Sequence, residues 1–158
     1  MKEVERIGDQ LSRAFEGKAW HGPAVMEILD GITAHDASAR PFKSTHSIWE
    51  IVLHIAAWES ACLRRLHGDR AQLPSEEDWP VVAETSEQSW EQCKKELQQG
   101  YEQLRSAISQ LADAQLDQPI VEGLSTVYVT LHGIVQHSLY HAGQIAILKK
   151  VVSEGEKA

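Results

Sequence analysis

The longest uninterrupted helical pattern of the chain lies near its C-terminal end and carries two histidines four residues apart. Apolar residues recur about every 3.6 residues from Thr126 to about Val152, which predicts one long amphipathic helix. The run of β-branched and aromatic residues at 127–130 has strand propensity, but the long pattern that follows outweighs it. His137 and His141 are four positions apart, so both side chains project from one face of this helix.

Three further segments show helical spacing, and no convincing strand is present. They are residues 4–32, with an interruption near Gly17–Pro23, residues 47–67 and residues 85–111. The second begins with a capping box, in which Ser47 and Glu50 satisfy each other's backbone N–H groups. Residues 33–44 and 70–83 contain prolines and read as loops. We therefore predict an all-α fold, a four-helix bundle formed by a single domain over residues 1–158, with an interrupted first helix.

Composition excludes several functional classes. The chain has 158 residues, 42% of them hydrophobic, which suits one ordinary globular domain. Its net charge is −8 and it has no basic cluster, so we expect no nucleic-acid partner. No apolar stretch approaches the roughly 18–20 residues that span a bilayer, so we expect no membrane association. The N-terminal segment lacks an apolar signal core, and Cys62 and Cys93 read as free thiols, which together predict a cytoplasmic protein.

A third histidine could complete a metal site. His54 lies at the edge of the apolar stripe of the second helical segment. If that helix is a neighbour of the last one, His54, His137 and His141 could hold one ion, because ligands in bundles project inward from facing helices. Imidazole suits zinc, nickel, cobalt and iron(II), and three such ligands leave positions open for a small molecule. The alternative is that these histidines are core or boundary residues, each satisfied by a hydrogen bond.

These residues resemble the sequence motifs of the DinB/YfiT superfamily. The resemblance rests on residues 47–54 with Trp58 and Glu59, on the His-x-x-x-His-x-Gly-Gln motif at residues 137–144, and more weakly on residues 20–23 and 29–33. It implies a four-helix bundle, a metal held by His54, His137 and His141, and a cleft open to substrate. Members with an assigned activity include thiol-dependent S-transferases and a mycothiol-dependent isomerase, and others are described as hydrolases. Homodimers are common in this superfamily, so we expect a homodimer.

Other side chains are candidates for the surroundings of such a site. The candidates for the pocket are Trp58, Gln144, Tyr140, His46 and His21. Each has a plainer interpretation as well, since aromatic residues at helical spacing usually fill a core and histidines near helix ends usually cap or face solvent. His132 should point away from the pair, because five residues along a helix turn a side chain by about 140°.

Two functional hypotheses are the most specific that the sequence supports. In the first, the protein is an enzyme in which a divalent transition metal activates a thiol or water for S-transfer or hydrolysis on a small-molecule substrate. Zinc or nickel is the expected metal, with iron or cobalt as alternatives, and a low-molecular-weight thiol is the expected co-substrate. In the second, the protein is a non-catalytic, stress-related module that binds a metal or a small ligand. A structural protein that acts through a dimer surface remains a third alternative.

Overall fold

The protein is all-α, as predicted. The computed structural model describes residues 1–155, which contain seven α-helices, one short 3-10 turn at Asp113–Gln115 and no strand. The single extended pairing within these residues is an isolated bridge between Pro119 and Thr126 in the loop before the last helix. None of the helices in this range is long and apolar enough to cross a membrane.

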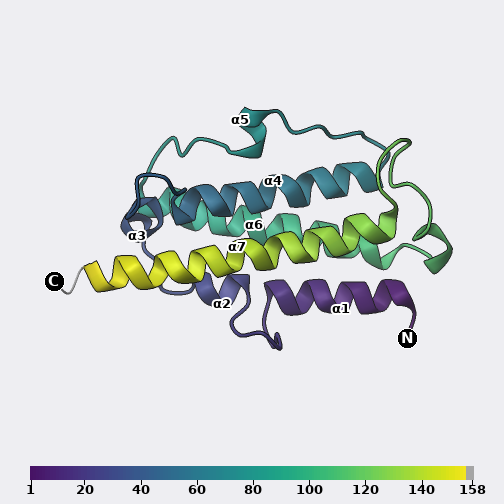
Figure 1. The fold of residues 1–158 in the computed structure, drawn as a ribbon, viewed down its shortest axis with the longest axis horizontal. Coiled ribbons are helices and arrows are strands. Elements are labelled where there is room, and N and C mark those ends of the chain that lie inside the picture. The colour runs from purple at the N-terminus through teal and green to yellow at the C-terminus, as the bar shows by residue number, and fades with distance from the viewer. Residues whose placement is uncertain (156–158) are drawn as a thin grey trace.

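Four long helices lie side by side and form the body of the molecule (Figure 1). They are α1 (Glu3–Phe15), α4 (Ile48–Leu66), α6 (Glu87–Ser109) and α7 (Val127–Gly155). Helix α4 contacts both α6 and α7, and α1 contacts the same two helices. Helix α7 is the longest, and α1 and the short α2 (Val25–Leu29) follow one another along it (Figure 1). The histidine-bearing helices α4 and α7 are therefore direct neighbours.

Side-chain caps set where the helices begin. The Ser47 hydroxyl accepts a hydrogen bond from the Glu50 N–H at 3.2 Å, and the Glu50 carboxylate accepts one from the Ser47 N–H at 2.8 Å. This is the predicted capping box, and it satisfies two N–H groups that have no partner inside the helix. At the start of α6 the Ser86 hydroxyl accepts a hydrogen bond from the Ser89 N–H, and at the start of α7 the Thr126 hydroxyl accepts one from the Val129 N–H.

The first predicted helix is interrupted, as expected, between Phe15 and Val25. Gly17 lies in this interruption with a φ of +150°, in the region that favours glycine. A Cβ atom at this position would lie 3.0 Å from a carboxylate oxygen of Glu27, so there is little room for a side chain. The second piece, α2, ends at Leu29, earlier than the predicted end near residue 32.

Two short helices occupy segments that the sequence predicted as loops, so this part of the prediction was wrong. Helix α3 (Ala34–Ser38) lies within residues 33–44, and α5 (Ser75–Asp78) lies within residues 70–83. Helix α3 forms because the Thr33 hydroxyl accepts a hydrogen bond from the Asp36 N–H, a cap that the sequence analysis overlooked. The chain around α5 arches over α4 (Figure 1), and this arch matters for the site described below.

The core lies between the four long helices. The Phe15 ring of α1 stacks on the Tyr101 ring of α6, with ring centroids 4.0 Å apart. Trp90 of α6 is fully buried, and its indole N–H donates to the carbonyl oxygen of Ile32 at 2.7 Å. These contacts fix α1 and the connection after α2 against α6. Helix α4 also packs against α6, and another of its faces contacts α7.

Candidate metal centre

Three histidines meet between α4 and α7. His54 of α4 joins His137 and His141 of α7, and each of the three offers a ring nitrogen within 4.8 Å of the others. The Nε2 atoms of His54 and His137 are 3.0 Å apart. The His141 ring centroid is 4.6 Å from that of His54 and 4.5 Å from that of His137. We call these three residues the histidine cluster.

Hydrogen bonds on the far side of two rings set which nitrogen carries the proton. His54 Nδ1 lies 2.7 Å from the backbone carbonyl oxygen of Asp78. A carbonyl oxygen only accepts, so Nδ1 carries the hydrogen and Nε2 presents a lone pair to the cluster. His141 Nδ1 lies 2.8 Å from Gln144 Oε1, which has the same consequence. Metal-ligating histidines are commonly oriented by such partners on the other ring nitrogen.

Asp78 places a carboxylate next to the cluster. Its Oδ1 lies 3.1 Å from His54 Nδ1 and accepts a 2.7 Å hydrogen bond from the indole N–H of Trp58. Asp78 therefore contacts two side chains of α4. Its backbone carbonyl oxygen and its carboxylate hold the His54 ring, and its carboxylate also holds the Trp58 indole. Its negative charge would partly compensate a cation bound by three neutral imidazoles.

An aromatic side chain covers His54. The Trp79 indole stacks on the His54 ring, with centroids 3.8 Å apart and planes 6° from parallel. The His46 ring stacks on Trp79 as well, at 3.6 Å and 7°. Asp78 and Trp79 both come from the end of α5, and the sequence analysis selected neither. The available signal was the tryptophan itself, because a large aromatic residue in a polar loop usually packs against something.

Two of the three histidines favour the neutral form, which can bind a metal. Burial, together with the neighbouring His141 and His54, lowers the pKa of His137 to about 4. Burial also lowers the pKa of His141, although its hydrogen bond to Gln144 opposes this. Both rings are therefore uncharged at neutral pH, which is the state that binds metal.

The geometry of the ring nitrogens fits a shared transition-metal ion. His54 Nε2 and His137 Nε2 are 3.0 Å apart, which is the distance of a hydrogen bond from one ring nitrogen to the other. Nitrogens roughly 3 Å apart are also what one ion produces, because each metal–imidazole bond is about 2.0–2.1 Å long. His137 Nδ1 is buried without a hydrogen-bond partner within residues 1–155, so this ring lacks the outer partner that the other two have.

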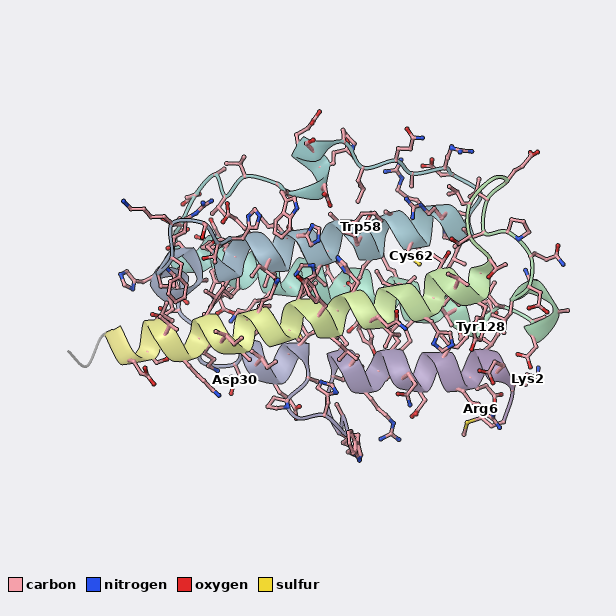
Figure 2. All side chains as sticks on the ribbon, in the orientation of Figure 1. Lys2, Arg6, Asp30, Trp58, Cys62 and Tyr128 are labelled. Carbon is pink, nitrogen blue, oxygen red and sulfur yellow. The ribbon has the colours of Figure 1, made fainter. Side chains whose placement is uncertain are left out.

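Two cavities reach the cluster from different directions. The first, which we call the apolar cavity, has a volume of about 400 Å³, and its lining includes Phe42, His46, Trp79, Tyr140, His141 and Gln144. The second, the arginine cavity, has a volume of about 300 Å³, and its lining includes Trp58, Cys62, Arg65, Thr130 and His137. Figure 2 shows Trp58 and Cys62 following one another along α4.

Comparison with known protein families gives one match that spans most of the chain. The family model of the DinB superfamily matches residues 20–145, a range that contains all three histidines of the cluster.

The chain belongs to the DinB superfamily.

No curated protein matches it. Among solved structures, this DinB-superfamily chain is similar to a conserved protein from Enterococcus faecalis, with a TM-score of 0.75 and 20% identity over 98% of this chain and 99% of that one. At this identity the likeness shows the shared fold alone.

The other sequence-selected residues of this DinB-superfamily member fall into two groups. Trp58, His46, Tyr140 and Gln144 lie around the cluster, in the contacts and cavities just described. His21 does not, because it is exposed in the loop between α1 and α2.

His132 also lies outside the histidine cluster, as the sequence predicted. Its ring contacts Tyr128, with centroids 4.4 Å apart. Arg65, which lines the arginine cavity, was not selected from the sequence.

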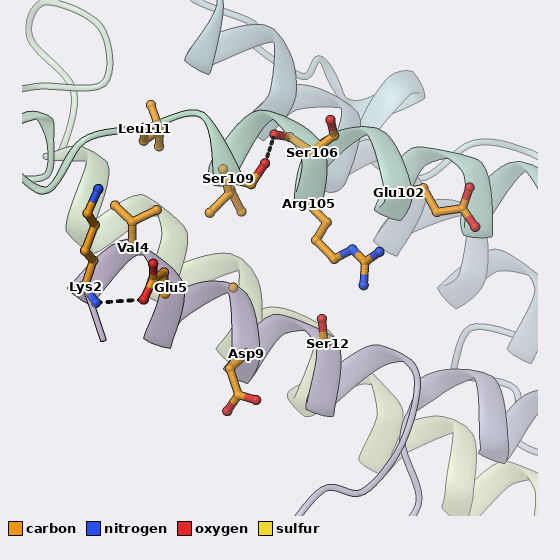
Figure 3. A pocket seen from close by; sticks show the side chains of 12 residues that line it. Lys2, Val4, Glu5, Asp9, Ser12, Glu102, Arg105, Ser106, Ser109 and Leu111 are labelled. Atoms are coloured by element: carbon orange, nitrogen blue, oxygen red, sulfur yellow. Dashed lines mark hydrogen bonds between the residues drawn. The ribbon is translucent and has the colours of Figure 1, made fainter.

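A larger cavity lies elsewhere in the molecule. It is a groove of about 690 Å³ between α1 and α6 (Figure 3). Its polar lining mixes both charges, with Lys2 and Arg105 beside Glu5, Asp9 and Glu102. No histidine or cysteine lines it, so it offers no comparable group of metal ligands.

Proposed function

We propose that this protein is a metal-dependent enzyme that activates a thiol or water for S-transfer to, or hydrolysis of, a small substrate. One observation carries the proposal. Three imidazoles converge beneath two cavities, and within residues 1–155 the cluster contains no fourth protein ligand. Catalytic metal sites typically have three protein ligands and leave the fourth coordination position to water or substrate. Structural sites have four protein ligands.

The residues around the cluster have separable tasks in this proposal. A divalent transition metal bound there would lower the pKa of a thiol or water and so supply thiolate or hydroxide at neutral pH. Asp78 and Gln144 hold the rings of His54 and His141 so that each presents a lone pair. Trp79 covers His54 and keeps bulk water from that side of the ring.

The reaction itself requires no further cofactor. The nucleophile's sulfur or oxygen forms a bond to an electrophilic carbon of the substrate. The bond from that carbon to the leaving group breaks, and the leaving group departs with the electron pair. The proton of the thiol or water passes to solvent. The cavities contribute by holding nucleophile and substrate in contact.

The apolar cavity favours a small, uncharged electrophile. Its apolar wall consists of Phe42, Ile51, Trp79, Tyr140, Ile147 and Leu148, and no lysine, arginine or carboxylate of residues 1–155 lines it. Its volume of about 400 Å³ lies within the usual range for small-molecule sites. Gln144 and His46 contribute polar side chains to this cavity, and they could orient a carbonyl or a nitro group.

The proposal is tested by turnover with metal-loaded protein. Zinc- and nickel-loaded samples would be assayed with glutathione or cysteine and 1-chloro-2,4-dinitrobenzene for S-transfer, and with p-nitrophenyl acetate for hydrolysis. We expect turnover in the wild type and its loss in His54→Ala. His67→Ala is the matched control, because His67 lies at the exposed end of α4 and should leave turnover unchanged.

Two results would contradict the proposal. Equal turnover in wild type and His54→Ala would show that the histidine cluster is not involved. Stoichiometric metal binding without turnover, over a broad panel of thiols and electrophiles, would instead support the non-catalytic binding module.

A further inference from the structure

The two cavities give the histidine cluster two chemically different approaches. His141 lines the apolar cavity and His137 lines the arginine cavity, and no residue within 1–155 lines both. Within residues 1–155, no lysine or arginine lines the apolar cavity, whereas Arg65 lines the arginine cavity. A two-substrate reaction requires such a division, because each reactant then binds where its own chemistry is recognised.

Arg65 is a cation without a carboxylate partner. Its Nη2 donates to the Ala71 carbonyl oxygen at 3.0 Å, and its Nε donates to that of Arg70 at 3.4 Å. The preceding residue, Arg64, pairs instead with the carboxylate of Asp69 at 2.7 Å. Among residues 1–155, no carboxylate forms an ion pair with Arg65, although the chain carries a net charge of −8. Its hydrogen bonds within this range go to backbone carbonyl oxygens through Nε and Nη2, so Nη1 remains available to donate.

Trp58 connects this cation to the cluster. The Arg65 guanidinium lies over the Trp58 ring, 5.5 Å from the ring centroid. The His137 ring lies 5.9 Å from the same indole, and the indole N–H is held by Asp78. An elongated molecule that crosses the face of one indole would therefore reach from Arg65 to His137.

The Cys62 thiol, which also lines this cavity, is not reactive. Burial raises the pKa of the Cys62 thiol to about 12, although Arg65 opposes this. The side chain is buried and remains a neutral thiol at physiological pH, so it does not compete with an incoming nucleophile.

We propose that the arginine cavity binds the carboxylate of the nucleophilic co-substrate, a small thiol acid whose sulfur reaches the histidine cluster. The inference rests on the proposed function, and it assigns the electrophile to the apolar cavity. Arg65 pairs with the carboxylate through a charge-assisted hydrogen bond, and Trp58 supports the aliphatic chain between the two ends.

The test uses cobalt-loaded full-length protein, because cobalt suits imidazole ligands and its visible absorption reports thiolate binding. The probes are 6-mercaptohexanoate and 6-mercaptohexanol, which have chains of similar length and differ in the charged end. We expect the acid to bind about tenfold more tightly than the alcohol to the wild type, as a charge-assisted hydrogen bond would give. In Arg65→Gln this preference should disappear, while the affinity for the alcohol stays the same.

Controls separate the carboxylate effect from loss of structure. Arg64→Gln should keep the preference, because Arg64 is exposed and paired with Asp69. Arg65 also holds two loop carbonyls, so an unchanged alcohol affinity in Arg65→Gln shows that the cluster is intact. Arg65→Lys keeps the charge and should retain part of the preference.

The outcomes distinguish this inference from the function on which it rests. Equal affinity of acid and alcohol for the wild type, or an acid preference that survives in Arg65→Gln, would overturn the inference and leave the proposed function standing. If the cobalt-loaded wild type bound neither thiol, the proposed thiol chemistry would be refuted, and the inference with it.

Discussion

A buried carboxyl group in α4 offers the sharpest test of the packing. Glu59 is 0% exposed, and neither of its carboxylate oxygens has a hydrogen-bond partner within residues 1–155. Gly100 of α6 packs against it. An isolated carboxylate is costly to bury, so burial raises the pKa of Glu59 from 4.5 to about 8.

The shifted pKa makes stability depend on pH in a defined direction. Between pH 4.5 and about 8 the folded protein keeps a proton on Glu59 that the unfolded chain has lost. The free energy of unfolding therefore decreases as pH rises through this window, by up to about 1.4 kcal/mol per pH unit. Below the window the penalty is absent, and above it the penalty is fully present and constant.

The perturbation is Glu59→Gln, which keeps the shape and removes the titration. The free energy of unfolding would be measured by urea denaturation at several pH values from 5 to 8, on metal-free protein. We expect the free energy of unfolding of the variant, relative to that of the wild type, to increase as pH rises, by up to about 1.4 kcal/mol per pH unit. The histidines of the cluster are present in both proteins, so any effect they have on the pH dependence cancels in the difference.

Glu122→Gln is the control, because Glu122 is exposed in the loop before α7 and should give no such slope. A constant difference between Glu59→Gln and wild type across this pH range would refute the reasoning, because it would mean that Glu59 titrates alike in the folded and unfolded states.

Three further substitutions test individual contacts. Ser47→Ala removes the cap of α4 and should lower the free energy of unfolding by about 1 kcal/mol. Ser44→Ala, at an exposed position, is the control and should not lower it. Equal effects of the two substitutions would show that the Ser47 cap does not stabilise α4. Asp78→Asn removes the carboxylate charge beside His54 and should weaken metal binding by about tenfold in a competition titration with a chelating dye, and unchanged affinity would contradict its role. Trp90→Phe leaves a buried carbonyl without its donor and should cost about 1–3 kcal/mol in urea denaturation, so a loss near zero would contradict this hydrogen bond.

The long helices could be predicted because their signals are local. Ser47 caps α4 where the sequence indicated, α6 begins close to the predicted residue 85, and the apolar spacing after Thr126 identified α7. A cap and a repeating apolar stripe are readable from neighbouring residues alone. The short helix α3 also had a local signal, the cap formed by Thr33, which the prolines and polar residues around it obscured.

The surroundings of the cluster could not be predicted in the same way. His137 and His141 share a face by their spacing, but their meeting with His54 depends on α4 and α7 being neighbours. Asp78 and Trp79 reach the cluster because the chain around α5 arches over α4, which no local pattern specifies. Arg65 became notable only when the fold showed Arg64 paired with Asp69, and Arg65 without a carboxylate partner among residues 1–155.

The most direct test of the account is the metal content of tag-free protein, measured by plasma mass spectrometry after reconstitution. The wild type would be compared with the double variant His54→Ala/His141→Ala, which removes one ligand from each helix. The account predicts about one equivalent of a divalent transition metal in the wild type and loss of that metal in the variant. A wild type that binds no metal after reconstitution, or a variant that keeps it, would contradict the assignment of these histidines as a metal centre.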